Sequence, residues 1–157
     1  METGNAAAPG PGFGRHLPAI PEKTAMRFLV AYLATVTVFL LVDLAWLGVV
    51  ARSFYVRQLA ALLRDRPRPV AAILFYGLYG LGIVVFAVLP GTEDGGWSKA
   101  LVQGALFGFF AYATYGLTNY ATLRGWPLSL TLVDLAWGTL LSALAAALGT
   151  AATLALI

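Results

Sequence analysis

Two aspartates, Asp43 and Asp134, stand inside long apolar stretches of this 157-residue chain and are the only acidic or basic side chains there. Each lies in the same string, Val-Asp-Leu-Ala-Trp, at 42–46 and at 133–137. Because Asp and Trp stand three residues apart, they share one face of a helix. A carboxylate within lipid costs on the order of a few kcal/mol, so its presence is a hypothesis for a functional site. The two groups could act as acid and base or pair with arginine.

The depth of the two aspartates in the membrane is similar. Asp43 precedes Ala51 by about 12 Å of helix, and Asp134 follows Pro127 by about 10 Å. The chain has four apolar stretches, each long enough to cross a membrane. If each one does, Ala51 and Pro127 lie at the same membrane surface, which we call side A. We therefore expect the aspartates to form one coupled site near side A. An inverted repeat would place its copies at mirrored depths, so internal duplication does not explain the two strings.

Other polar side chains converge on the same layer and complete a candidate binding site. Tyr115, Thr118 and Asn119 lie near the end of the third apolar stretch, while Tyr55, Arg57 and Arg124 can reach it from the surface. Together with the two strings, the candidate binding residues are Asp43, Trp46, Tyr55, Arg57, Tyr115, Thr118, Asn119, Arg124, Asp134 and Trp137. Carboxylates, an amide, aromatic rings and guanidinium groups in one layer favour binding of a lipid headgroup or a small amphiphile.

Structural roles for these residues stay open beside the functional ones. Asp134 could brace the start of its helix, and Asp43 could pair with arginine as glue between helices. For the four tryptophans (46, 97, 126 and 137), anchoring at the membrane interface is the favoured interpretation. The glycines of the second stretch and the Gly104-xxx-Gly108 pair of the third predict close helix contacts.

The elements that hold these residues are four apolar stretches, at about 28–51, 70–89, 100–123 and 128–157. Each exceeds the roughly 18 residues that a membrane span needs. The chain is 60% hydrophobic and 11% charged, which is too apolar for a soluble domain of this size. The sequence predicts an all-α integral membrane protein, a bundle of four transmembrane helices over residues 24–157.

Polar segments separate and precede the spans. Residues 1–23 are rich in Pro, Gly and Ala, and we expect a disordered N-terminal tail. Residues 52–69 and 124–127 lie on side A, and the 90–99 turn and both termini lie on the other side. Side A carries six Arg and the opposite side carries four Arg or Lys, which favours a cytoplasmic side A.

Several kinds of chemistry are excluded by composition. The chain has no Cys, which removes disulfides, Fe–S clusters and thiolate zinc sites, and its one His is in the N-terminal tail. We therefore expect no metal, no cofactor and no nucleic-acid partner. The expected partners are membrane lipids and either a second copy of the chain or another membrane protein.

The chain resembles the bacterial membrane-protein family called domain of unknown function 2177. The resemblance covers about residues 28–148 and rests on VDLAWLG at 42–48, ARSFYVR at 51–57, LTN at 117–119 with ATLRGWP at 121–127, and VDLAWG at 133–138. It implies a small multi-pass protein of the bacterial cytoplasmic (inner) membrane and brings no known activity. Many members have Asp where this chain has Gly116, so the carboxylate layer here is built from Asp43 and Asp134.

Three functions are consistent with this pattern. The first is a non-catalytic membrane module that binds a lipid headgroup, small amphiphile or partner helix through a pocket on side A. The second is a small proton-coupled transporter that works as a dimer; an antiparallel dimer would have one pocket at each face. The third, a lipid-modifying enzyme with two carboxylates as acid and base, lacks an evident nucleophile.

Overall fold

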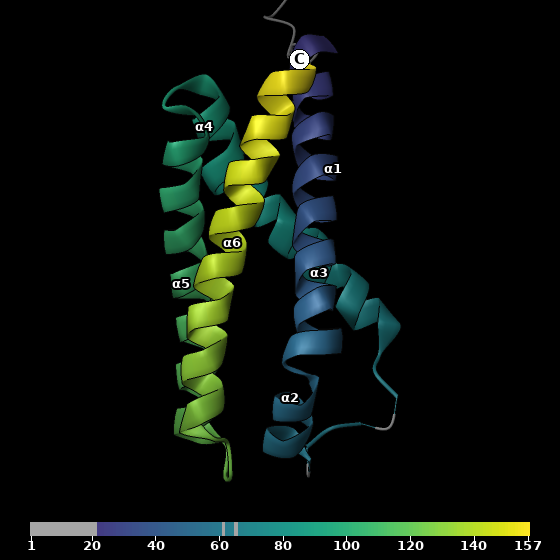
Figure 1. The fold of residues 1–157 in the computed structure, drawn as a ribbon, viewed down its shortest axis with the longest axis vertical. Helices are drawn as coiled ribbons and strands as arrows, with labels where there is room; N and C mark the ends of the chain where they lie inside the picture. Colours follow the sequence, from purple (N-terminus) through teal and green to yellow (C-terminus); the bar gives the residue numbers. More distant parts are fainter. Residues whose placement is uncertain (1–21, 61, 65) are drawn as a thin grey trace, which may run out of the picture.

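The computed structural model describes residues 22–60, 62–64 and 66–157, which form a bundle of four long helices (Figure 1). The first span consists of α1 (Glu22–Ala45) and the π-helix η1 (Trp46–Val50), and α2 (Arg52–Leu59) follows it. The second span consists of α3 (Pro69–Ile83), the π-helix η2 (Val84–Val88) and α4 (Leu89–Glu93). The third and fourth spans are α5 (Gly96–Thr122) and α6 (Leu128–Leu156). All four are long and apolar enough to cross a membrane, which confirms the predicted fold class.

The helix ends differ from the predicted ones at two places. Glu22 and Lys23 belong to α1, and the rest of the predicted tail lies outside the described residues. The second span continues to Glu93, so that only Asp94 and Gly95 separate α4 from α5. Proline inside an α-helix clashes with the carbonyl four residues earlier. The wider turn of η2 comes directly before Pro90 and lets the helix continue past it.

The fourth span is the central element of the bundle. In the most apolar 18-residue segment of each span, 50% of the residues of α6 are buried, compared with 22% in the first and third spans. Figure 1 shows α6 between α1 and α5, while α3 passes obliquely behind them. The buried apolar core consists of Ala31, Phe39, Ile83, Val84, Ala87, Val88, Ala100, Leu141, Ala145 and Ala146.

Glycines allow the closest approaches between helices, as predicted. A Cβ at Gly104 or Gly108 of α5 would lie within 2.6 Å of α6 backbone oxygens. A Cβ at Gly80 of α3 would lie 2.5 Å from a methyl carbon of Val36 on α1. The Gly104-xxx-Gly108 pair therefore sets the α5–α6 distance, and Gly80 sets the α1–α3 distance.

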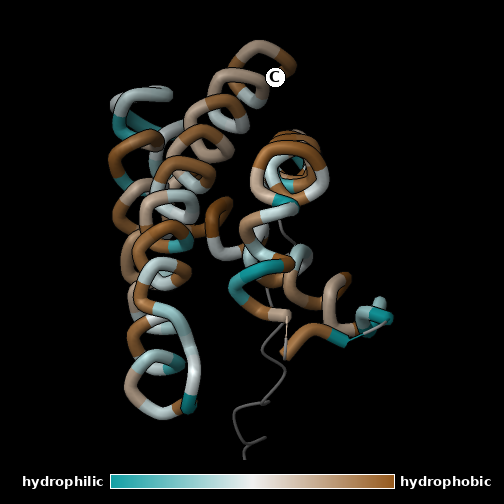
Figure 2. The backbone as a smooth tube through the Cα atoms, turned by 60° about the horizontal axis from the view of Figure 1, so that its bottom comes forward, coloured by the Kyte–Doolittle hydropathy of each residue, from teal (hydrophilic) through white to brown (hydrophobic). Residues whose placement is uncertain are grey.

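The two ends of the bundle carry different connections. The start of α1 and the end of α6 lie together at one end, while α2 and the turn before α6 lie at the other, which is side A (Figure 1). Hydrophilic residues gather at the connections, and the helices are mostly apolar (Figure 2). The obliquity of α3 separates it from α5 towards side A, and this separation shapes the site described next.

Candidate functional site

Asp43 joins three helices in the interior of the bundle. Its side chain is 4% exposed and accepts two hydrogen bonds, one on each carboxylate oxygen. The Trp137 indole of α6 donates to Oδ1 at 3.0 Å. The Tyr76 hydroxyl of α3 donates to Oδ2 at 2.7 Å. Both donors are neutral, so Asp43 is held by hydrogen bonds rather than by an ion pair.

Asp134 is held by a chain of two donors from the other half of the sequence. The Tyr55 hydroxyl of α2 donates to Asp134 Oδ1 at 2.5 Å, and the Trp46 indole donates to the Tyr55 hydroxyl at 3.4 Å. Tyr55 reaches this position because the first span ends at Val50, and Ala51 connects it directly to α2. Burial, together with the hydrogen bond to Asp134, raises the pKa of the Tyr55 hydroxyl still further above neutral.

The two Val-Asp-Leu-Ala-Trp strings exchange their hydrogen bonds. Trp137 of the second string donates to Asp43 of the first, and Trp46 of the first reaches Asp134 of the second through Tyr55. The two indole rings stack between them, with centroids 4.2 Å apart and planes 11° from parallel. The aspartates thus belong to one connected network of α1, α2, α3 and α6 near side A.

This network gives two of the tryptophans contacts within the bundle beyond the predicted interfacial anchoring. Trp46 and Trp137 are half-buried, stack on each other and donate to Tyr55 and to Asp43 respectively. Trp97, which is 58% exposed beside the α4–α5 connection, retains the position of an anchor. Trp126 donates to the Thr131 hydroxyl at 3.1 Å and braces the turn before α6.

The other predicted site residues lie outside the network. Arg57 and Arg124 are exposed, and within residues 22–60, 62–64 and 66–157 no basic side chain pairs with either buried carboxylate. Long cationic side chains near helix ends reach water at lower cost than they reach the interior. Thr118 is exposed and Asn119 is half-buried, and neither hydrogen-bonds to an aspartate in the described part of the chain. Tyr115 packs edge-on against Trp126 and lines the cavity described next.

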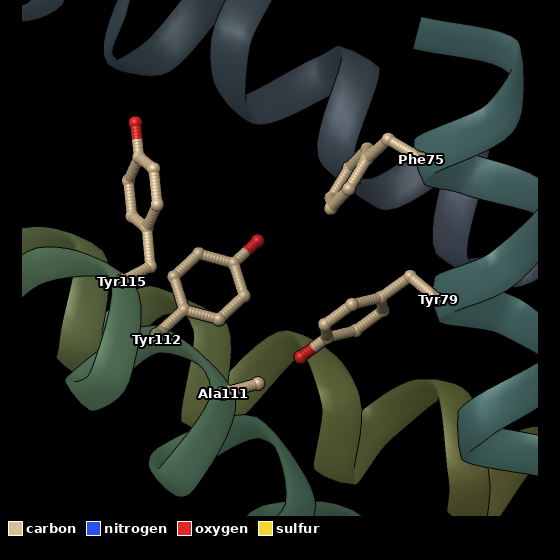
Figure 3. Close-up of a pocket in the computed structure, with 5 residues that line it drawn as sticks. All are labelled: Phe75, Tyr79, Ala111, Tyr112 and Tyr115. Atoms are coloured by element: carbon tan, nitrogen blue, oxygen red, sulfur yellow. The ribbon is translucent and has the colours of Figure 1, made fainter. Parts of the chain in front are cut away.

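A cavity of about 430 Å³ lies between α3 and α5, beside the segment of α3 that carries Tyr76, the partner of Asp43. Phe75 and Tyr79 of α3 and Ala111, Tyr112 and Tyr115 of α5 line it (Figure 3). Phe75 and Tyr115 are 42% and 54% exposed, so the cavity is open on its outer side. At the level of the spans, this open side faces away from the bundle.

The tyrosine hydroxyls of the cavity differ in their environment. The Tyr79 hydroxyl is 2.8 Å from the Ser142 hydroxyl of α6 and is satisfied there. The Tyr112 hydroxyl points towards the space between Phe75 and Tyr79, whereas the Tyr115 hydroxyl points away (Figure 3). Among the described residues, nothing hydrogen-bonds to the Tyr112 hydroxyl. Among the side chains that the structure describes around this cavity, the Tyr112 hydroxyl therefore points into it and is available to a ligand.

Sequence reasoning missed Tyr76 and all the residues that line the cavity except Tyr115. A signal for Tyr76 was present, because it follows Pro69 by seven residues and thus lies about 10 Å from side A, at the depth of Asp43. The cavity could not be predicted from spacing, because it depends on the oblique course of α3 relative to α5 (Figure 1). In the part of the chain that the structure describes, no group of three His, Cys, Asp or Glu side chains could hold a metal ion.

The exchange of hydrogen bonds between the strings predicts energetic coupling between Asp43 and Asp134. Asp43→Asn and Asp134→Asn keep the side-chain shape and at least one acceptor oxygen, so neither leaves a cavity. We expect their effects on thermal unfolding to deviate from additivity by more than about 0.5 kcal/mol, the scatter of independent sites. Asp43→Asn combined with the exposed Asp94→Asn is the control and should be additive. Additivity in both cycles would mean that the aspartates act independently.

The comparisons with known proteins identify a family and no characterised relative. The family model described as a predicted membrane protein, domain of unknown function 2177, matches residues 28–151. No curated protein matches the chain, and no solved structure matches it either. The matched segment includes both aspartate strings and every residue that lines the cavity between α3 and α5.

Proposed function

We propose that this chain, which belongs to the family of predicted membrane proteins called domain of unknown function 2177, is a non-catalytic module that binds a neutral amphiphile. The single observation that carries the proposal is the cavity of about 430 Å³ between α3 and α5. Its volume is within the range of about 300–1,000 Å³ that is usual for small-molecule sites. Its aromatic walls suit an apolar group, and the Tyr112 hydroxyl suits one oxygen of a head group.

The lining indicates the charge of the ligand. All five side chains that line the cavity are uncharged. A charged head group would lose water there without gaining a partner of opposite charge, and such burial is strongly unfavourable. A neutral head with hydroxyl or carbonyl oxygens can hydrogen-bond to Tyr112 instead. We therefore prefer a neutral amphiphile to an anionic lipid as the occupant.

Hydrogen bonds of the aspartate network and of Ser142 hold α3, which forms one wall of the cavity, in place. Tyr76 and Tyr79 are neighbours on α3, and their hydroxyls bond to Asp43 and to Ser142 respectively. These bonds fix the side-A half of α3 to α1 and α6, although α3 diverges from α5. In this proposal the aspartates hold the cavity open rather than touch the ligand.

The proposal predicts that filling the cavity abolishes binding. With monoolein as the probe and the full chain in detergent, we expect Ala111→Trp to weaken binding at least about tenfold, since an indole occupies the space. Tyr112→Phe should weaken it about fivefold, because one hydrogen bond contributes about 1 kcal/mol. Native mass spectrometry over a series of probe concentrations measures both.

Two controls sharpen this experiment. Ala105→Trp makes the same substitution on α5 in the groove of about 460 Å³ on its other face, and it should leave monoolein binding unchanged. Oleoyl lysophosphatidic acid adds a phosphate to the same glycerol and chain, and the part of its binding that Ala111→Trp removes should be weaker than the corresponding part for monoolein. Equal effects of the two tryptophan variants on monoolein, or a tighter Ala111→Trp-sensitive binding of the phosphate-bearing probe, would contradict the proposed function.

A further inference from the structure

A second cavity lies at the opposite membrane surface, where α1 begins and α4 ends. Its volume is about 210 Å³. Lys23, Thr24 and Arg27 line it from α1, and Thr92 and Glu93 line it from α4. It shares no lining residue with the cavity between α3 and α5 and lies at the other end of the bundle.

The charges around this cavity have both signs. Lys23 and Arg27 are four residues apart in the first turns of α1 and therefore share one helix face. Glu93 lies across the cavity at the end of the second span. In the part of the chain that the structure describes, no ion pair joins Glu93 to Lys23 or Arg27. The cations and the carboxylate thus face one cavity without neutralising each other.

The floor of the cavity is apolar, and its walls carry hydroxyls. Phe28 and Leu89 complete the lining on the side of the spans, and Phe28 is 38% exposed. The Thr92 hydroxyl donates to the Leu89 carbonyl at 2.8 Å, which leaves its oxygen lone pairs as acceptors. An occupant would therefore meet cations on one wall, acceptors on the other and apolar groups beneath.

We propose that this cavity binds a lipid with a phosphoethanolamine head group. Lys23 and Arg27 match the phosphate, since cationic side chains make strong charge-assisted bonds to it. Glu93 and the Thr92 oxygen match the ammonium group, which is a donor only. Phe28 and Leu89 match the first carbons of the acyl chains. A purely anionic head group would meet the Glu93 carboxylate instead, so the two-signed lining selects a zwitterion.

The test compares soluble short-chain lipids bound to the full chain in detergent. Dihexanoyl phosphatidylethanolamine should bind about fivefold more tightly than dihexanoyl phosphatidylglycerol, as expected for one partly exposed charge pair. Glu93→Gln should abolish this preference. Arg27→Gln should weaken the binding of both lipids about fivefold, because both carry the phosphate.

The controls separate this site from general surface charge and from a soluble ligand. Asp94→Asn makes the same change in net charge one residue further on, at a carboxylate that pairs with Lys99, and it should keep the preference. Glycerophosphoethanolamine has the head group without acyl chains and should bind more weakly than the lipid. Equal affinity of the wild type for both lipids, loss of preference in Asp94→Asn, or equal binding of the chain-free head group would overturn the proposal.

Discussion

Asp43→Ala should lower the free energy of unfolding by about 2 kcal/mol, since it leaves two half-buried donors without an acceptor. The Trp137 indole can only donate a hydrogen bond, so without the Asp43 oxygen its N–H has no acceptor. The Tyr76 hydroxyl loses its acceptor as well. Contributions of single hydrogen bonds between membrane helices are often below 1 kcal/mol, which keeps the expected loss near this value. Thermal unfolding of the purified chain in detergent measures it.

Asp43→Asn separates the role of the acceptor oxygen from that of the charge. Its amide oxygen still accepts from Trp137, and its amide group donates to the Tyr76 hydroxyl, which can reverse its role. We therefore expect a loss of less than about 1 kcal/mol for this variant. Asp94→Ala removes an exposed carboxylate and serves as the control. If Asn and Ala at position 43 destabilise the chain equally, the ionised form of Asp43 and not its hydrogen bonds would be the source of stability.

The four spans could be predicted because their signal is local. An uninterrupted apolar stretch of sufficient length specifies a membrane helix whatever its neighbours are. The continuation of the second span through Pro90 to Glu93 could not be predicted in this way. Proline and the polar residues after it indicate a turn, and only the wider turn of η2 relieves the clash that proline would cause.

The candidate site could be predicted in part, because depth along a helix follows from residue number. Similar distances from side A, about 12 Å and about 10 Å, brought Asp43 and Asp134 to one level, and a distance of about 10 Å would have indicated Tyr76 as well. Which tryptophan bonds to which aspartate depends on the rotation of each helix about its axis. That rotation follows from the packing of α1 and α3 against α6 and is not encoded in spacing.

Depth alone does not predict whether the two arginines near side A enter the polar layer. Arg57 and Arg124 have side chains long enough to enter the polar layer, yet both are exposed. Each carboxylate already accepts a bond from a neutral donor, so an arginine would lose its hydration for a smaller gain. The tyrosines, which lose little water on burial, occupy the positions that charge alone would assign to arginine.

Gly108→Ala should be among the most damaging single substitutions, with a loss of about 1–3 kcal/mol or failure to assemble the bundle. A Cβ at this position would lie 2.3 Å from the Gly138 carbonyl oxygen of α6. A backbone oxygen cannot rotate away as a side chain does, so α5 and α6 would have to separate. Thermal unfolding in detergent, compared with the wild type, measures the loss.

Gly48→Ala is the matched control, since nothing lies within 4 Å of a Cβ built there. Because alanine restricts the unfolded chain more than glycine does, we expect this variant to be neutral or slightly stabilised.

Gly108→Ala should also affect ligand binding, because the Cβ at position 108 would lie 2.7 Å from the Ser142 Cβ. Ser142 bonds to Tyr79, whose ring lines the cavity between α3 and α5, so a shift of Ser142 reaches the ligand site. We therefore expect Gly108→Ala to lose monoolein binding even under conditions in which it stays folded, whereas Gly48→Ala binds as the wild type does. A folded Gly108→Ala variant with unchanged affinity would show that the α5–α6 contact does not shape the cavity.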